Sequence, residues 1–128
     1  MAHNENTLRE EMKNPDNVYL IGDQTYYSSN CGNVPDEDRI TDILMDCGAT
    51  SVFTQLFESS KHNTFHGVFN DYIISVHTDR NKNSISTTHA IDINKSGKDE
   101  FERVSIECGR KQYEINDRLY SAFYGRCE

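Results

Sequence analysis

Residues 72–93 read YIISVHTDRNKNSISTTHAIDI, and this stretch decides the fold class. It holds two β-prone runs, 72–78 and 84–93, in which apolar and polar residues alternate with the two-residue period of a strand. The Asp and Asn residues of 79–83, between the runs, favour a turn. The stretch therefore predicts two antiparallel strands joined by a hairpin loop.

Alternating runs on both sides of this hairpin predict further strands, at about 51–57, 64–70 and 102–108. The stretch 51–60 is ambiguous, because a short apolar run suits a buried helix as well as a strand. Nearer the N-terminus, Val18–Ile21 and Gln24–Tyr27 flank Gly22-Asp23, which predicts a hairpin with a type II′ turn.

The strongest helix signal lies at 35–47. Pro35 suits the first turn of a helix, and Gly48 suits its C-terminal stop. Apolar residues recur between them at three- and four-residue spacing and form one stripe: Ile40, Ile43, Leu44 and Cys47. Two shorter helices are expected at 7–14, where Thr7 and Glu10 form a capping box, and at about 116–124.

Strands gathered in the middle of the chain, with helices towards its ends, indicate an α+β fold rather than a βαβ sheet. We expect residues 1–128 to form a single globular domain, which is the commonest size for one. Its antiparallel sheet would have about five to seven strands, with about three helices packed on it.

The chain has no apolar run long enough to span a membrane, and its first residues, MAHNENTLREEMKN, lack the apolar core of a secretory signal. We therefore expect a cytoplasmic protein without a membrane partner. Four cysteines stand without a C-x-x-C pair, at 31, 47, 108 and 127, and free thiols are expected in that compartment. Cys31 is the one candidate nucleophile, although a plain loop cysteine is the preferred interpretation.

The formal net charge is −8, and the first half of the chain carries nearly all of it. Residues 1–63 hold eleven acids against four Lys or Arg, whereas 64–128 hold ten acids against nine. On the 35–47 helix, the acids and one methionine form a stripe opposite the apolar face: Asp38, Asp42, Met45 and Asp46. This stripe is either a solvated face or a docking surface for a basic partner, with Met45 at its centre.

Small size, an acidic half and the lack of an assembled catalytic motif favour a non-catalytic binding protein. We expect an inhibitor or regulator of the phage or mobile-element anti-defence type, or of the toxin-immunity type. Such a protein would dock its acidic surface on a basic partner protein that handles nucleic acid. Direct nucleic-acid binding is not expected, because the Lys and Arg residues are few and dispersed.

The histidines support an alternative function. If Thr78 pairs with Ser84, then His77 and His89 share one face of the sheet, with Ser75 and Thr87 between them. Such a patch would suit a small hydrolase or a nucleotide-processing enzyme, since histidine titrates near neutral pH. No residue is firmly assigned a catalytic role.

His62 and His66 have the i,i+4 spacing of a helical metal site, but their surroundings predict a strand. On a strand the two residues stand about 13 Å apart, which is too far to share an ion. We therefore expect no metal and no cofactor.

Overall fold

A computed structural model describes residues 19–21, 25–28, 33–57, 62–92 and 100–124. The elements in chain order are β1 (Tyr19–Ile21), β2 (Thr25–Ser28), α2 (Glu37–Asp46), β3 (Ser51–Phe57), β4 (His62–Val68), β5 (Tyr72–Asp79), β6 (Ser84–Asp92) and α4 (Phe101–Tyr124).

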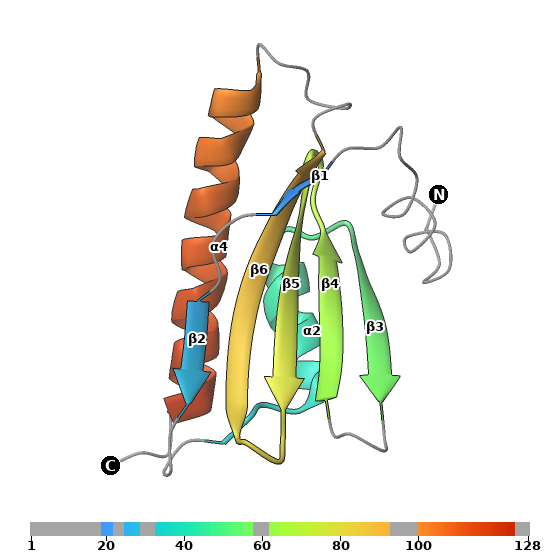
Figure 1. Ribbon diagram of the computed structural model, residues 1–128, viewed down its shortest axis with the longest axis vertical. Coiled ribbons are helices and arrows are strands. Elements are labelled where there is room, and N and C mark those ends of the chain that lie inside the picture. The colour runs from blue at the N-terminus through green and yellow to red at the C-terminus, as the bar shows by residue number, and fades with distance from the viewer. Residues whose placement is uncertain (1–18, 22–24, 29–32, 58–61, 93–99, 125–128) are drawn as a thin grey trace.

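Four long antiparallel strands form the body of the sheet in the order β6-β5-β4-β3, and β1 and β2 add short segments on the free side of β6 (Figure 1). Both described helices pack on the same face, α2 over β3 and β4 and α4 over β5 and β6. The α+β class is confirmed. The counts differ from the expected five to seven strands and three helices, since four strands are long and two helices are described. The helix expected at 7–14 lies outside the described residues.

The N-terminal hairpin prediction is wrong. β1 and β2 do not pair with each other, because both pair antiparallel with β6, Ile21 opposite Ala90 and Thr25 opposite Thr87. The nine-residue edge of β6 accommodates both runs end to end, which a Gly-Asp turn signal does not reveal.

The helix predicted at 35–47 is confirmed as α2. The Asp36 side chain accepts a hydrogen bond of 2.8 Å from the Arg39 backbone N–H and caps the N-terminus. At the other end, Gly48 takes a φ of 105°, and its N–H donates to Met45 O. The Ala49 N–H donates to Leu44 O, which completes a Schellman motif.

The strand predicted at 102–108 is wrong, because these residues begin the 24-residue helix α4. Val104, Ile106 and Cys108 alternate like a strand, but only Val104 and Cys108 are buried, while Ile106 is 52% exposed. The buried positions of α4 continue at helical spacing as Ile115, Leu119 and Phe123. A longer window would have favoured one amphipathic helix.

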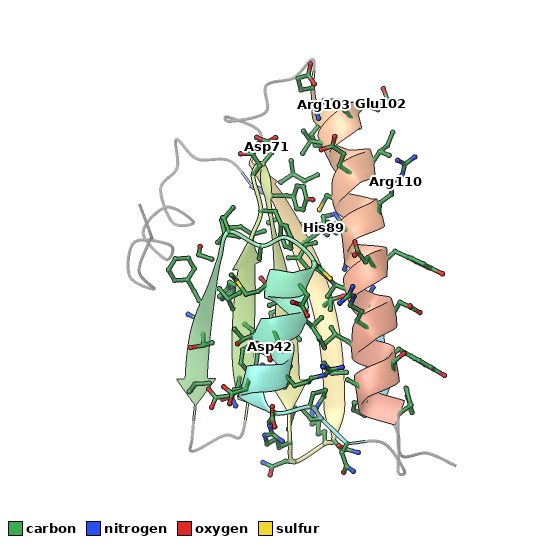
Figure 2. The ribbon with its side chains drawn as sticks, turned by 180° about the vertical axis from the view of Figure 1, so that it is seen from behind. Asp42, Asp71, His89, Glu102, Arg103 and Arg110 are labelled. Carbon is green, nitrogen blue, oxygen red and sulfur yellow. The ribbon has the colours of Figure 1, made fainter. Side chains whose placement is uncertain are left out.

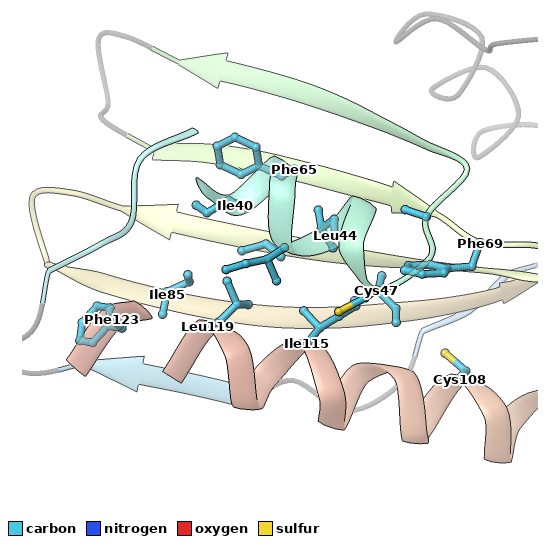
Figure 3. Packing of buried hydrophobic residues seen from close by; sticks show 14 of the residues in the cluster. Ile40, Leu44, Cys47, Phe65, Phe69, Ile85, Cys108, Ile115, Leu119 and Phe123 are labelled. Atoms are coloured by element: carbon cyan, nitrogen blue, oxygen red, sulfur yellow. The ribbon is translucent and has the colours of Figure 1, made fainter. Parts of the chain in front are cut away.

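The core lies between the helices and the sheet. Figure 3 shows Ile40 and Leu44 of α2 and Leu119 of α4 directed at the strands that carry Phe65 and Ile85. Gly67 of β4 leaves room for α2, because a Cβ there would lie 3.0 Å from Leu44 Cδ2. Burial of this apolar layer holds the two helices on one face of the sheet.

The hairpin loop predicted at 79–83 is confirmed, and it also positions α2. Asp79 Oδ1 accepts hydrogen bonds from the backbone N–H groups of Asn81 and Lys82. Asn83 Oδ1 accepts from the Val34 N–H at 3.2 Å, and Arg80 donates to the carbonyl oxygens of Val34 and Pro35. The segment that leads into α2 is thereby tied to the loop between β5 and β6.

Candidate functional site

The outward side of α2 carries an exposed acidic surface. We call it the α2 acidic face, and it consists of Asp38, Asp42, Met45 and Asp46, all exposed as the sequence predicted. Met45 is 46% exposed in spite of its apolar side chain. Figure 2, which looks onto the helices, shows Asp42 on the side of α2 turned away from the sheet.

The acidic face follows from the amphipathic pattern of α2. Its opposite side buries Ile40, Ile43 and Leu44 against the sheet, which forces the carboxylates outward. Glu37 and Asp38 lie in the first turn, where the helix dipole favours negative charge, and the last turn holds no basic residue. Between Asp36 and Asp46 the helix carries five acids against the single cation Arg39. The local field is therefore negative.

One member of the face is partly compensated from α4. Asp46 Oδ2 lies 3.9 Å from the Arg118 guanidinium, and both side chains are largely exposed. An exposed ion pair of this length contributes about 0–1 kcal/mol. Asp38 and Asp42 thus contribute more of the uncompensated charge than Asp46 does.

A second cluster lies on the face of the sheet opposite to α2 and α4, towards the viewer in Figure 1. Its side chains come from the four long strands and are linked by hydrogen bonds. We call this cluster the polar row, and it consists of Gln55, Thr64, His66, Ser75, His77 and Thr88. Among the described residues, every buried side-chain nitrogen or oxygen has a hydrogen-bond partner.

His66 joins a serine and an amide in this row. Its Nε2 lies 2.9 Å from Gln55 Oε1, which only accepts, so Nε2 carries the proton. With the proton on Nε2, Nδ1 accepts a hydrogen bond from the Ser75 hydroxyl at 2.7 Å. The order hydroxyl, imidazole and orienting group is that of a serine nucleophile with its base.

His77 is held between two threonines, with Nδ1 3.3 Å from Thr64 Oγ1 and Nε2 3.0 Å from Thr88 Oγ1. Burial lowers the pKa of His77 from its ordinary value of 6.5, and the neighbouring His62 lowers it further. The ring is therefore neutral at neutral pH, and both of its nitrogens are occupied by hydroxyl groups.

The predicted register, which placed His77 and His89 on the same face of the sheet, is wrong. The register is shifted by one residue, so that Thr78 pairs with Ile85, His77 with Ser86 and His89 with Ile74. A shift of one residue moves a side chain to the other face. Ser75 stays with His77 on the polar row, whereas Thr87 and His89 lie beneath α4.

Under α4, His89 belongs to a hydrogen-bond chain that attaches the helix to β6. His89 Nδ1 donates to Gln112 Oε1, and Gln112 Nε2 donates to Thr87 Oγ1 at 3.0 Å. The Thr87 hydroxyl donates to Asn116 Oδ1 at 2.6 Å. This network orients α4 on the sheet. Sequence reasoning missed Gln55 and His66 in the polar row and Gln112 in this network, because only the register brings them to their partners.

Among the described residues, neither the cysteines nor the side chains of metal-binding type are arranged as a reactive centre. Cys47 and Cys108 are free and buried, and burial raises the pKa of both thiols, that of Cys108 to about 12. His62 and His66 lie on strand β4, as predicted. Within the described ranges, no three His, Cys, Asp or Glu side chains are grouped to hold a metal ion. Cys31 and Cys127 lie outside these ranges.

A cavity of about 390 Å³ opens at the N-terminal end of α2. Arg39 and Arg80 line it, with Asp36 between the helix and the loop and Phe123 of α4 at its side. Arg80 already donates to two carbonyl oxygens, so its guanidinium fixes the loop. No pattern in the sequence predicted this cavity.

Comparisons with family models, with curated proteins and with solved structures gave no match to this chain. Neither described helix is long and apolar enough to cross a membrane.

Proposed function

We propose that the protein is a non-catalytic binding protein that docks the α2 acidic face on a basic surface of a partner protein. The observation that carries this proposal is the arrangement of Asp38, Asp42 and Asp46 around the exposed Met45 on one outward side of α2. Carboxylates of this kind steer a cationic partner, while a methionine that becomes buried on docking supplies apolar contact. An inhibitor or regulator would use such a face to cover a basic, nucleic-acid-handling surface, as anti-defence and immunity proteins do.

The rigid attachment of α2 supports this proposal. Its N-terminus is capped by Asp36 and tied to the β5–β6 loop, and its C-terminus ends in a Schellman motif. A binding surface on a fixed helix loses little conformational entropy when a partner docks. The acidic face is therefore presented in one orientation.

The test starts from affinity capture in the native host, followed by mass spectrometry of the retained proteins. The Asp38→Lys, Asp42→Lys double variant changes the net charge from −8 to −4, because each replacement adds two positive charges. Asp46 is left in place, since a lysine there would repel Arg118. We expect the double variant to lose the captured partner and to keep the melting temperature of the wild type, because exposed replacements change stability by about 0.5 kcal/mol.

A matched control carries the same charge change on α4, as Glu102→Lys with Asp117→Lys, two exposed acids that form none of the ion pairs of the described part of α4. It should retain the partner, which separates local contact from net charge. Wild-type association should slow as salt is added, because the Debye length falls to about 8 Å at physiological ionic strength. Equal capture by the wild type and the α2 double variant would refute the docking role of this face.

A second function, ester hydrolysis by Ser75, has one specific observation in its favour. The Ser75 hydroxyl donates to His66 Nδ1, and Gln55 orients the ring from the other side. We rank it second for two reasons: Ser75 is only 7% exposed, and its strand is paired on both sides. Those ladders leave few backbone N–H groups to form an oxyanion hole.

A fluorophosphonate probe distinguishes the two functions. Labelling of the wild type that is lost in Ser75→Ala and in His66→Gln would replace the binding proposal with a serine hydrolase. Absence of labelling in the folded protein would remove the hydrolase from consideration.

A further inference from the structure

The outward side of α4 carries an apolar stripe that lies outside the hydrophobic core, with one ring contact to it, from Tyr120 to Tyr124 at 4.5 Å. We call it the α4 stripe, and it consists of Ile106, Tyr113 and Tyr120, which are 52%, 76% and 51% exposed. Their spacing is i, i+7 and i+14, so they stand one above another over about 21 Å of helix. Large apolar side chains aligned on one exposed face mark an interaction site more often than scattered ones do.

The α4 stripe points away from the rest of the described fold. The core side of α4 is formed by other residues, with Val104, Ile115 and Leu119 fully buried. The side towards α2 is marked by Lys111 and Arg118, which contact Cys47 and Asp46. Arg110, next to the stripe, lies on the outer side of the helix in Figure 2, away from α2.

Gly109 gives the stripe a point of close approach. It lies on the same side of the helix as Ile106 and Tyr113, it is exposed, and a Cβ built there would have no neighbour within 4 Å. An exposed glycine in a helix interior destabilises it by about 1 kcal/mol relative to alanine. No contact among the described residues requires a glycine at this position. A second helix backbone packed against this point would require it.

Two residues of opposite charge lie beside the stripe, and the pair matches the same pair on a second copy of the chain. Arg110 and Asp117 are both exposed and lie on the same flank, about 10 Å apart along the axis, with Tyr113 between them. The ion pairs of α4 within the described residues use Arg103, Lys111 and Arg118 as their cations. Arg110 and Asp117 are not among these pairs, so both remain available to a partner.

We propose that two copies of this chain pair through the α4 stripe as an antiparallel, two-fold symmetric helix pair. With Ile106, Tyr113 and Tyr120 at the a positions of a heptad, Arg110 and Asp117 occupy e positions, and antiparallel helices bring e against e. Arg110 of each copy then meets Asp117 of the other, and Ile106 meets Tyr120. The two-fold axis passes near Tyr113, as an isologous interface requires.

The charge pattern selects this arrangement over a parallel one. In a parallel pair, e positions face g positions, which here are Ser105, Gln112 and Leu119 and offer no charge to Arg110 or Asp117. One helix per copy buries less than the roughly 800 Å² per partner of a standard interface. The dimer is therefore expected to dissociate on dilution. The dimer does not use α2, so the experiments on dimerisation and those on the proposed function test separate surfaces.

Sedimentation equilibrium of the full chain tests the pairing. We expect a reversible monomer–dimer equilibrium with a dissociation constant in the range of about 1 μM to 1 mM. Tyr113→Glu should make the protein monomeric throughout, because it places a charge at the axis. Met45→Glu is the matched control on α2 and should leave the equilibrium unchanged. A wild type that stays monomeric at about 1 mM overturns the proposal.

Charge reversal tests the orientation. Arg110→Glu or Asp117→Arg alone places like charges together twice in each dimer and should raise the dissociation constant at least tenfold. The double variant restores opposite charges and should return it to within about threefold of the wild type. If the changes in binding free energy of the two single variants simply add in the double variant, the antiparallel pairing is overturned, whatever the wild-type affinity.

Discussion

The ammonium group of Lys111 lies 2.6 Å from the carbonyl oxygen of Cys47, so that α4 caps the C-terminus of α2. α2 has no basic residue in its own last turn, where the helix dipole favours a cation. Glu114 holds the same ammonium group at 3.1 Å, and the Phe69 ring lies beneath it at 6.0 Å. This contact fixes the end of the α2 acidic face relative to α4.

Replacement of this lysine should weaken the fold. Lys111→Met keeps the length of the side chain but leaves the Cys47 carbonyl without its cation, which should cost about 1 kcal/mol. Lys111→Arg is the control, because it retains the charge and the donor, and it should lose less. Urea unfolding measures both. Equal midpoints for the wild type and the methionine variant would show that the contact contributes nothing to stability.

Two glycines should respond to alanine with opposite signs. In Gly67→Ala, the new methyl group meets Leu44 Cδ2 at 3.0 Å and Phe69 Cε2 at 3.3 Å inside a packed core. Overpacking should outweigh the entropy gained and destabilise the protein by about 1–2 kcal/mol. In Gly109→Ala the methyl group has open space, and the higher helix propensity of alanine should stabilise the protein by about 0.5–1 kcal/mol.

Thermal unfolding of both variants, at a concentration where the protein is monomeric, provides the measurement. A loss of stability in Gly109→Ala would show that a Cβ at this exposed position meets an obstacle. A gain in Gly67→Ala would show that α2 has room to move away from β4.

His77 should make the fold sensitive to mild acid. Its pKa is lowered in the folded state, mainly by burial and further by His62, so the unfolded chain takes up a proton at a higher pH than the folded one. The stability linked to His77 is therefore complete above about pH 6.5 and decreases as pH falls below it. His77→Gln should flatten the decrease in free energy of unfolding between about pH 7 and pH 5.

His62→Gln is the matched control for this experiment. His62 is exposed, and it affects His77 only as the weaker of the two causes of the shift. Its replacement should leave the pH dependence close to that of the wild type. If His77→Gln has the same slope as the wild type, the acid sensitivity arises elsewhere in the fold.

Local signals determined α2 and the loop between β5 and β6. The Gly48 stop and the spacing of Ile40, Ile43 and Leu44 act within one helix, and the structure follows them. The helix begins at Glu37, after the Asp36 cap, and not at Pro35 as predicted. Asp79 likewise makes its turn with its own neighbours, Asn81 and Lys82. Such contacts join residues that are only a few positions apart, so a short segment of sequence contains the whole pattern that predicts them.

The tertiary structure decided those features that depend on contacts between residues far apart in the sequence. Val104, Ile106 and Cys108 alternate like a strand, yet burial against the sheet selected a helix that leaves Ile106 in solvent. The β5–β6 register moved His89 beneath α4 and joined His77 and Ser75 to a polar row with His66. A shift of the strand register by one residue leaves the sequence pattern unchanged but moves every side chain of the shifted strand to the other face of the sheet. The packing of α2 and α4 on one face makes the two registers unequal in energy, which is why the sequence pattern alone did not place the histidines.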